Sequence, residues 1–477
     1  MNFKTREFSI FALIFLIGLL GCDDYLALDP EQSLDPETAT DENGIEFALL
    51  GAYNELQDII DNEIIYAELT SDLADHTGSF PSWLQVDGFV QDINNAESNT
   101  LWNGYYDLVL SANFVIASAT SDSLQIAQAL GLRAYAYFNL SRWYGGVPLI
   151  LDPTRGPDGL NDISRSTLEQ TWARVREDLT QAESIFVDLS NKQSSSTAIK
   201  NGGTPNSVTV TLDVILSLKA RLELRAGNYE EAQRAATDVI NSSAQYSLAP
   251  SYILLYGTVQ TDPQGTTSEP IWQIPFDDQD NNGLSFFSRP NGNGGRFEYG
   301  PSEDLLALFN DNRIGNTSND TTLASERENA NIRILTGPGE DERLGKYFRT
   351  DGDDDVILIR LADLYLIRAE AAAKADFVAN GVAALNDLNR IRNRSGLVDV
   401  NLADAPDLAT FMKELLDERA REFTQEGSRY HDLTRQGFAT VVAEDANAAA
   451  ANDPNRLLYP VPFGEVEASG IRQNPGY

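Results

Sequence analysis

The chain has 477 residues, of which 72 are acidic and 35 basic, so its formal net charge is −37. Such a surface repels polyanions, which excludes binding to nucleic acid or to an anionic lipid surface through charge. The hydrophobic fraction of 42% is ample for a core, and the length allows one large domain or two to three small ones.

The first residues have the pattern of an export signal. Two basic residues precede a mostly apolar run at 8–20, which is shorter than the roughly 20 residues needed to span a bilayer. The run ends in Leu-Leu-Gly-Cys at 19–22, and Cys22 is the sole cysteine of the chain. This exit is similar to the bacterial lipobox, in which the cysteine sulfur receives a lipid and becomes the new N-terminus. We therefore expect residues 1–21 to be a lipoprotein signal peptide and Cys22 the lipid attachment site.

Helical periodicity dominates the segments that follow. In 44–56, apolar residues recur at i, i+4, i+7, i+8 and i+11, and 101–116 and 128–145 repeat the pattern. Each segment is predicted to be an amphipathic helix with one buried face.

Two later segments are predicted to be helix pairs. The first runs over 213–241, with a turn at Gly227-Asn228, and the second joins 359–375 to 381–397. Small alanines on the facing sides would let the helices approach closely. The pairs look like tetratricopeptide repeats, although the sequence between them is too irregular for a regular array.

Long polar stretches separate the helices. The stretches 190–210, 258–270 and most of 310–345 lack a period, whereas 269–276 and 353–360 are short strand-like runs. We therefore predict a mostly α fold, with a scaffold of tetratricopeptide-like helix pairs, a loop-rich irregular portion and a few short strands. Residues 22–477 would form a single domain with long loops at about 60–100, 190–210 and 257–345.

Specific strings identify a resemblance. They are CDDYLALDP after the lipobox, LWNGYYDLVLSANFVI, LRAYAYFNLSRWYGGVPLI, IRLADLYLIRAEA with LNRIRNRSGL, ERAREFTQEGSRYHDLTRQG, and a C-terminus with YPVP and a final QNPGY. Together they resemble the SusD/RagB family of outer-membrane nutrient-binding lipoproteins of the Bacteroidetes, over nearly the whole chain after Cys22.

The resemblance implies a binding protein and not an enzyme. Family members are anchored by lipid at the cell surface of the outer membrane, capture oligosaccharides or sometimes peptides, and form a lid on a SusC-like TonB-dependent transporter. Asp23-Asp24 look like the acidic signal that directs such lipoproteins to the cell exterior. A peptide-binding role is the alternative within the family, and a surface glycoside hydrolase or a purely organising repeat scaffold are rivals outside it.

Two segments carry candidate glycan-binding residues. Sugars stack on aromatic rings and offer hydroxyls to carboxylates, amides and guanidinium groups. The segment 67–88, where the family also carries ligand contacts, offers Asp72, Asp75, His76, Phe80 and Trp83. The alternative is that Phe80 and Trp83 only pin a loop to the core.

The second segment, 285–300, surrounds four glycines with aromatic and basic residues: Phe286, Phe287, Arg289, Arg296, Phe297 and Tyr299. A glycine-flexible loop of this composition is typical of a binding rim, and packing is again the alternative. From this segment we expect Arg289, Arg296 and Tyr299 to contact the glycan.

No metal or cofactor is expected. Asp278, Asp280 and Asn282 have the spacing of a calcium loop, but position 12 is Arg289 where a bidentate glutamate is needed. An acidic turn is the better interpretation, and the same holds for 350–355.

The segment 418–435 concentrates acids and arginines: Glu418, Arg419, Glu422, Glu426, Arg429, Asp432 and Arg435. Acid–arginine pairs three or four residues apart on helices indicate a structural network rather than a catalytic pair. The two histidines, His76 and His431, do not form a zinc motif.

Overall fold

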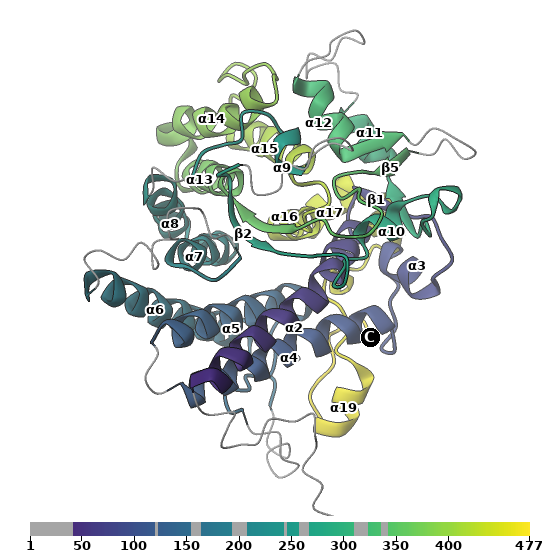
Figure 1. The fold of residues 1–477 in the computed structure, drawn as a ribbon. Helices are drawn as coiled ribbons and strands as arrows, with labels where there is room; N and C mark the ends of the chain where they lie inside the picture. Colours follow the sequence, from purple (N-terminus) through teal and green to yellow (C-terminus); the bar gives the residue numbers. More distant parts are fainter. Residues whose placement is uncertain are drawn as a thin grey trace, which may run out of the picture.

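The computed structural model describes residues 42–119, 123–153, 164–192, 208–242, 246–256, 267–309, 323–334 and 342–477. The expected signal peptide, Cys22, Asp23-Asp24 and most of the polar stretch 190–210 lie outside these residues. Figure 1 shows a helical scaffold on one side of the molecule and short strands and short helices on the other. No helix among the described residues is long and apolar enough to cross a bilayer.

Long helices form the first half of the scaffold. Helices α2 (Glu42–Leu69), α4 (Ala96–Ser118), α5 (Ser123–Tyr144) and α6 (Leu168–Lys192) pack side by side in chain order (Figure 1). The apolar stripe predicted for 44–56 is buried at Leu49 and Leu56. The predicted helices therefore form because one face of each is removed from water.

Both predicted helix pairs are present. Helices α7 (Leu212–Ala226) and α8 (Tyr229–Ser242) are joined where expected, because Gly227 adopts a left-handed conformation with φ of 79° that ends α7. Helices α13 (Leu361–Ala375) and α14 (Phe377–Arg394) form the second pair, and α13 also packs on α8.

The strand-like runs are strands, and they pair with each other. Strand β2 (Pro270–Ile274) is antiparallel to β6 (Val356–Arg360). Two further pairs join β1 (Ala74–His76) to β3 (Tyr299–Pro301) and β4 (Ile332–Ile334) to β5 (Glu342–Leu344). Every sheet among the described residues has two strands.

The regions expected as long loops at 60–100 and 257–345 hold more regular structure than predicted. The first contains the end of α2, β1, α3 (Pro81–Asp87) and the start of α4. The second contains β2 to β5 and several short helices: α10 (Leu284–Ser288), η3 (Asn291–Asn293), α11 (Glu303–Phe309) and α12 (Leu323–Asn331), while α9 (Ile253–Tyr256) precedes it. Helices this short have little apolar periodicity of their own and depend on tertiary packing, so the sequence pattern does not identify them.

The C-terminal segment closes the fold. It comprises α15 (Leu408–Phe423), α16 (Arg429–Gln436), α17 (Phe438–Glu444), α18 (Ala446–Ala451), η5 (Pro454–Leu457) and α19 (Phe463–Ser469). The final residues return to α5: Tyr459 N donates to Trp143 O at 2.7 Å, and the Asn474 amide donates to Tyr144 O at 3.1 Å. The YPVP and QNPGY strings thus attach the C-terminal segment to the end of α5.

Candidate functional site

The two segments with candidate binding residues lie side by side, although almost two hundred residues separate them in the sequence. Strand β1 pairs with β3 so that Asp75 lies opposite Gly300 and His76 opposite Tyr299. Ala74 faces Pro301 in the same register. The two loops next to these strands therefore form one continuous surface.

A buried carboxylate fixes the two loops to each other. Glu298 accepts hydrogen bonds from Ser79 N at 2.6 Å and Phe80 N at 3.1 Å, and from Arg296 Nε at 2.7 Å. Burial alone would raise the pKa of Glu298, but the donors from Arg296, Ser79 and Phe80 outweigh it and leave this pKa below its ordinary value. A Cβ at Gly78 would lie 2.0 Å from Glu298 Oε2, so the close approach requires glycine.

Aromatic side chains form a layered cluster under this surface. The Trp83 ring is 4% exposed and meets Phe80, Phe287 and Tyr299 edge-on, with centroids 5.2 to 6.4 Å apart. Trp83 therefore forms the floor of the surface, with no free ring face. The packing interpretation accounts for its position.

The outer layer consists of Phe80, Phe286 and Arg296, which we call the Phe80–Arg296 surface. The Arg296 guanidinium lies 4.0 Å from the centroid of the half-buried Phe80 ring, and its side chain is 45% exposed. Phe286 is 44% exposed, and its carbonyl accepts from Arg296 N at 2.9 Å. Aromatic rings and a cation are thus presented together to solvent.

Other predicted binding residues support the surface from inside. Asp72 is buried and bonded by Arg429 through two hydrogen bonds of 2.7 and 2.6 Å. Arg289 is buried and donates to Ser285 Oγ and Arg349 O. Tyr299 is fully buried, with its hydroxyl donating to Leu284 O at 3.2 Å. These side chains are occupied by protein partners.

Asp75 and His76 are successive residues of β1, so their side chains point to opposite faces of the strand. Burial raises the pKa of Asp75, and the nearby Asp304 and Glu303 raise it further. Burial lowers the pKa of His76, against the opposing effect of Glu298, so the imidazole tends towards its neutral form.

Sequence reasoning missed Glu298, the residue that organises the surface. Arg296 and Glu298 flank Phe297, which has a φ of 49°, so the chain is not extended there and strand alternation would not pair them. The backbone amides that donate to Glu298, those of Ser79 and Phe80, are remote in sequence.

A separate groove of about 570 Å³ lies beside the start of α2. Leu49, Leu50 and Tyr53 line it together with Ile274 and Pro275, and it shares no residue with the Phe80–Arg296 surface.

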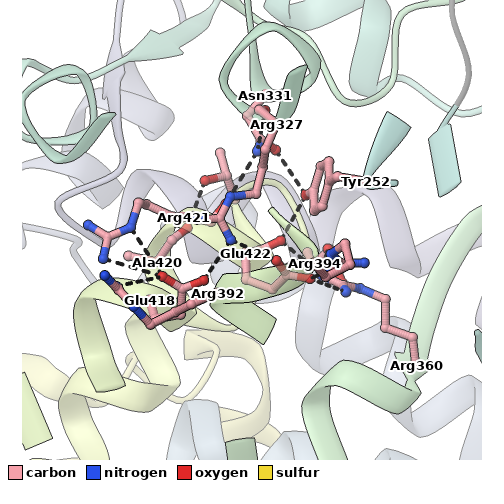
Figure 2. Close-up of polar contacts among 12 residues, drawn as sticks. Tyr252, Arg327, Asn331, Arg360, Arg392, Arg394, Glu418, Ala420, Arg421 and Glu422 are labelled. Carbon is pink, nitrogen blue, oxygen red and sulfur yellow. Dashed lines mark hydrogen bonds and ion pairs between the residues drawn. The ribbon is translucent and has the colours of Figure 1, made fainter. Parts of the chain in front are cut away.

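The acid–arginine segment is a structural network, as predicted. Arg327 bridges Glu418 at 2.7 Å and Glu422 at 2.9 Å, and Glu422 also accepts from Arg360 and Arg394 (Figure 2). We call these five residues the ion-pair core. Each is almost fully buried and bonded within the protein, which leaves no free carboxylate pair for acid–base chemistry.

Turn-forming contacts explain the calcium-like segment. Asp277 Oδ1 accepts from the backbone of Gln279 and Asp280, and the Asn282 amide donates to Gly352 O and Asp354 O. Among the described residues, no group of three or more His, Cys, Asp or Glu is arranged to hold a metal ion.

Comparison with known proteins identifies family models and relatives that are similar to this chain. The SusD family model matches residues 341–477, and a model described as "Starch-binding associating with outer membrane" matches residues 24–201. SusD-like protein P38 of Formosa agariphila is 25% identical, and the alignment covers 100% of both chains.

Solved structures share the fold. A SusD superfamily protein from Bacteroides vulgatus superposes with a TM-score of 0.75 at 18% identity, covering 92% of this chain and 99% of that one. A laminarin binding SusD-like protein superposes with a TM-score of 0.72 at 20% identity, covering 92% of this chain and 100% of that one.

Proposed function

The chain belongs to the SusD family, and from this membership we propose that it is a cell-surface lipoprotein that captures an oligosaccharide and passes it to a SusC-like TonB-dependent transporter. It binds the glycan without transforming it. The lipid on Cys22 anchors it to the outer membrane.

One observation carries the binding proposal: pairing of β1 with β3 presents Phe80, Phe286 and Arg296 together at the surface. An exposed ring offers a face for the apolar side of a sugar. The Arg296 guanidinium next to it can donate hydrogen bonds to the sugar hydroxyls. Trp83 acts indirectly, because it supports Phe80 and Phe287 from below.

The comparisons support a glycan as the ligand class. One matching family model is described as starch-binding, and a protein of the same fold is named for laminarin binding. Starch and laminarin are both neutral glucans, and a neutral ligand is compatible with a chain of net charge −37.

Isothermal titration of the chain without its signal peptide against neutral glycans and peptides tests the proposal. We expect a glycan to bind and Phe286→Ala to weaken it about 5- to 30-fold, the loss typical of a contact worth 1–2 kcal/mol. Phe463→Ala, on α19, is the matched control because Phe463 is 38% exposed and lies outside the surface. Unchanged affinity in Phe286→Ala, or binding of peptides alone, would overturn the assignment of the surface or of the ligand.

Anchoring and delivery need separate tests. Cys22→Ser should release the protein from the outer-membrane fraction, and the native protein should co-purify with a TonB-dependent transporter. Retention of the Cys22→Ser chain in the membrane would contradict the anchor. Release of product from the bound glycan over time would contradict a role in binding alone.

A further inference from the structure

A cavity of about 60 Å³ lies inside the helical scaffold and shares no residue with the Phe80–Arg296 surface. Its walls come from α2, α5 and α7 in the first half of the chain and from α13, α15 and α16 in the second. A buried water needs about 10–15 Å³ of such space, so the cavity accommodates one small ion or a few waters.

Most charged groups around this cavity are paired. The pairs, with their distances, are Arg142–Glu63 at 2.8 Å, Arg221–Asp363 at 2.8 Å, Arg419–Asp432 at 2.6 Å and Arg435–Glu370 at 2.6 Å. The carboxylate of Glu63 also accepts from the Tyr135 hydroxyl at 2.9 Å. These acids are therefore already engaged by other donors.

Arg225 of α7 is the exception among the arginines of the wall. Its hydrogen bonds go to neutral atoms, His431 O at 3.3 Å and Thr434 Oγ1 at 3.4 Å, and no carboxylate of the described residues forms an ion pair with it. Burial, with smaller contributions from Arg142 and Arg435, lowers the pKa of Arg225 to about 10. The group remains charged at neutral pH, and a partly buried charge without an ionic partner is unfavourable.

Two further side chains bring donors without protein acceptors to the same cavity. His431 is 3% exposed, and neither ring nitrogen has a hydrogen-bond partner among the described residues. Arg142 Nε is likewise buried without a partner. Burial lowers the pKa of His431 well below its usual value, and Arg142 and Arg225 add to this, so the ring is a neutral donor at pH 7.

We propose that this cavity binds one chloride-sized monovalent anion, held by Arg225 with the His431 ring and Arg142 Nε as additional donors. The anion balances the single unpaired positive charge of the wall. The engaged carboxylates of Glu63 and Asp432, which also line the cavity, disfavour a divalent anion. Since the donors come from α5, α7 and α16, the anion links the two halves of the scaffold.

Thermal unfolding of the unmodified chain in sodium chloride and in sodium gluconate at matched ionic strength tests the proposal. Raising chloride from about 1 to about 500 mM should raise Tm by about 1–3 °C more than gluconate does, because a ligand of the folded state stabilises it by mass action. Bromide should replace chloride. Equal Tm values in the two salts at every ionic strength would refute the site.

A substitution and a crystal structure test whether the chloride-specific shift in Tm arises from this cavity. Arg225→Met keeps the apolar stem of the side chain and should abolish the chloride-specific shift, whereas Arg234→Met, at a 50% exposed position on α8, should retain it. Crystals of the unmodified protein grown in bromide should show an anomalous peak between Arg225 and His431, and this measurement decides the matter even if Arg225→Met folds poorly. Water alone at that position would overturn the proposal.

Discussion

The ion-pair core and the Phe80–Arg296 surface both combine carboxylates with arginines, but the core buries its arginines and the surface exposes Arg296. In the core, Glu422 accepts from three arginines, and every member is almost fully buried (Figure 2). At the surface, one buried carboxylate, Glu298, holds two loops and leaves Arg296 and Phe286 exposed. The core bonds its charged groups mainly to one another, whereas the surface leaves Arg296 and Phe286 exposed, where we propose that they contact the ligand.

The largest effect is expected from breaking the core. Glu422→Gln removes the charge that Arg327, Arg360 and Arg394 share, which leaves buried guanidinium groups under-compensated. We expect the free energy of unfolding to fall by about 3–5 kcal/mol, measured by urea denaturation. The exposed Glu467→Gln on α19 is the control and should change it by less than about 0.5 kcal/mol. A loss for Glu422→Gln as small as that of the control would show that the core is not a scaffold.

Breaking the anchor of the surface should affect binding more than folding. In Glu298→Gln, an amide replaces a carboxylate that accepts from Ser79 N and Phe80 N, so at least one buried donor loses its acceptor. We expect a stability loss of about 1–3 kcal/mol and a loss of glycan affinity of at least tenfold. Both are measured on one preparation by denaturation and titration. Glu303→Gln, an exposed neighbour on α11, should leave both unchanged, and retained affinity in Glu298→Gln would argue that the loops bind independently.

The sequence predicted the two regions to different extents. The concentration of acids and arginines in 418–435 indicates a structural network, and Glu418–Arg421 and Asp432–Arg435 have the expected three-residue spacing. The partners Arg327, Arg360 and Arg394 of the ion-pair core come from remote segments, which local spacing does not identify. The pairing of β1 with β3 joins positions more than two hundred residues apart, and no local pattern specifies it.

The burial of the tryptophans shows the same limit of prediction from local sequence patterns. The helical and strand patterns predict that Trp102, Trp143, Trp172 and Trp272 are core residues. Trp102, Trp143 and Trp272 are buried, whereas Trp172 is only partly buried and its Nε1 donates to Ser141 Oγ at 3.1 Å. Trp83 was interpreted as a stacking residue because it lies in a loop-like segment, but Phe287 and Tyr299, from the remote segment, cover it. Burial by a distant segment is a tertiary property and cannot be obtained from periodicity.

A change of pH should have opposite effects on the stability contributed by a buried ion pair and by an acid next to the surface. Glu370 lies outside the ion-pair core and is paired with Arg435 and Lys374; burial alone would raise its pKa, but these two bases lower it to about 2. Its contribution is therefore present at pH 7 and is lost as pH falls from about 4.5 towards 2. Next to the surface, burial and the nearby Asp75 raise the pKa of Asp87 to about 6, above its unfolded value of about 3.9. Its folded form therefore binds the proton more tightly, and the resulting stability is lost as pH rises through about 6.

We therefore expect Asp87→Asn to flatten the dependence of unfolding free energy on pH between about 4 and 6, by about 1 kcal/mol after allowing for partial solvation. The acid limb below about pH 4 should be unchanged. Urea midpoints measured across pH 3 to 8 give both limbs in one series. An unaltered slope between about pH 4 and 6 would contradict the raised pKa of Asp87.

The smallest effect on stability is expected from an ion pair that is exposed to solvent. On α8, Arg234 pairs with Glu231 at 2.5 Å and with Asp238 at 3.0 Å, but the Arg234 side chain is 50% exposed. Solvent screens both pairs, and ordering the long side chain opposes them, so Arg234→Met should change the free energy of unfolding by less than about 0.5 kcal/mol. Raising the ionic strength should reduce even that difference, whereas the loss in Glu422→Gln should persist, because buried pairs are screened much less. A loss for Arg234→Met comparable to that for Glu422→Gln would show that burial does not determine the contribution of these pairs.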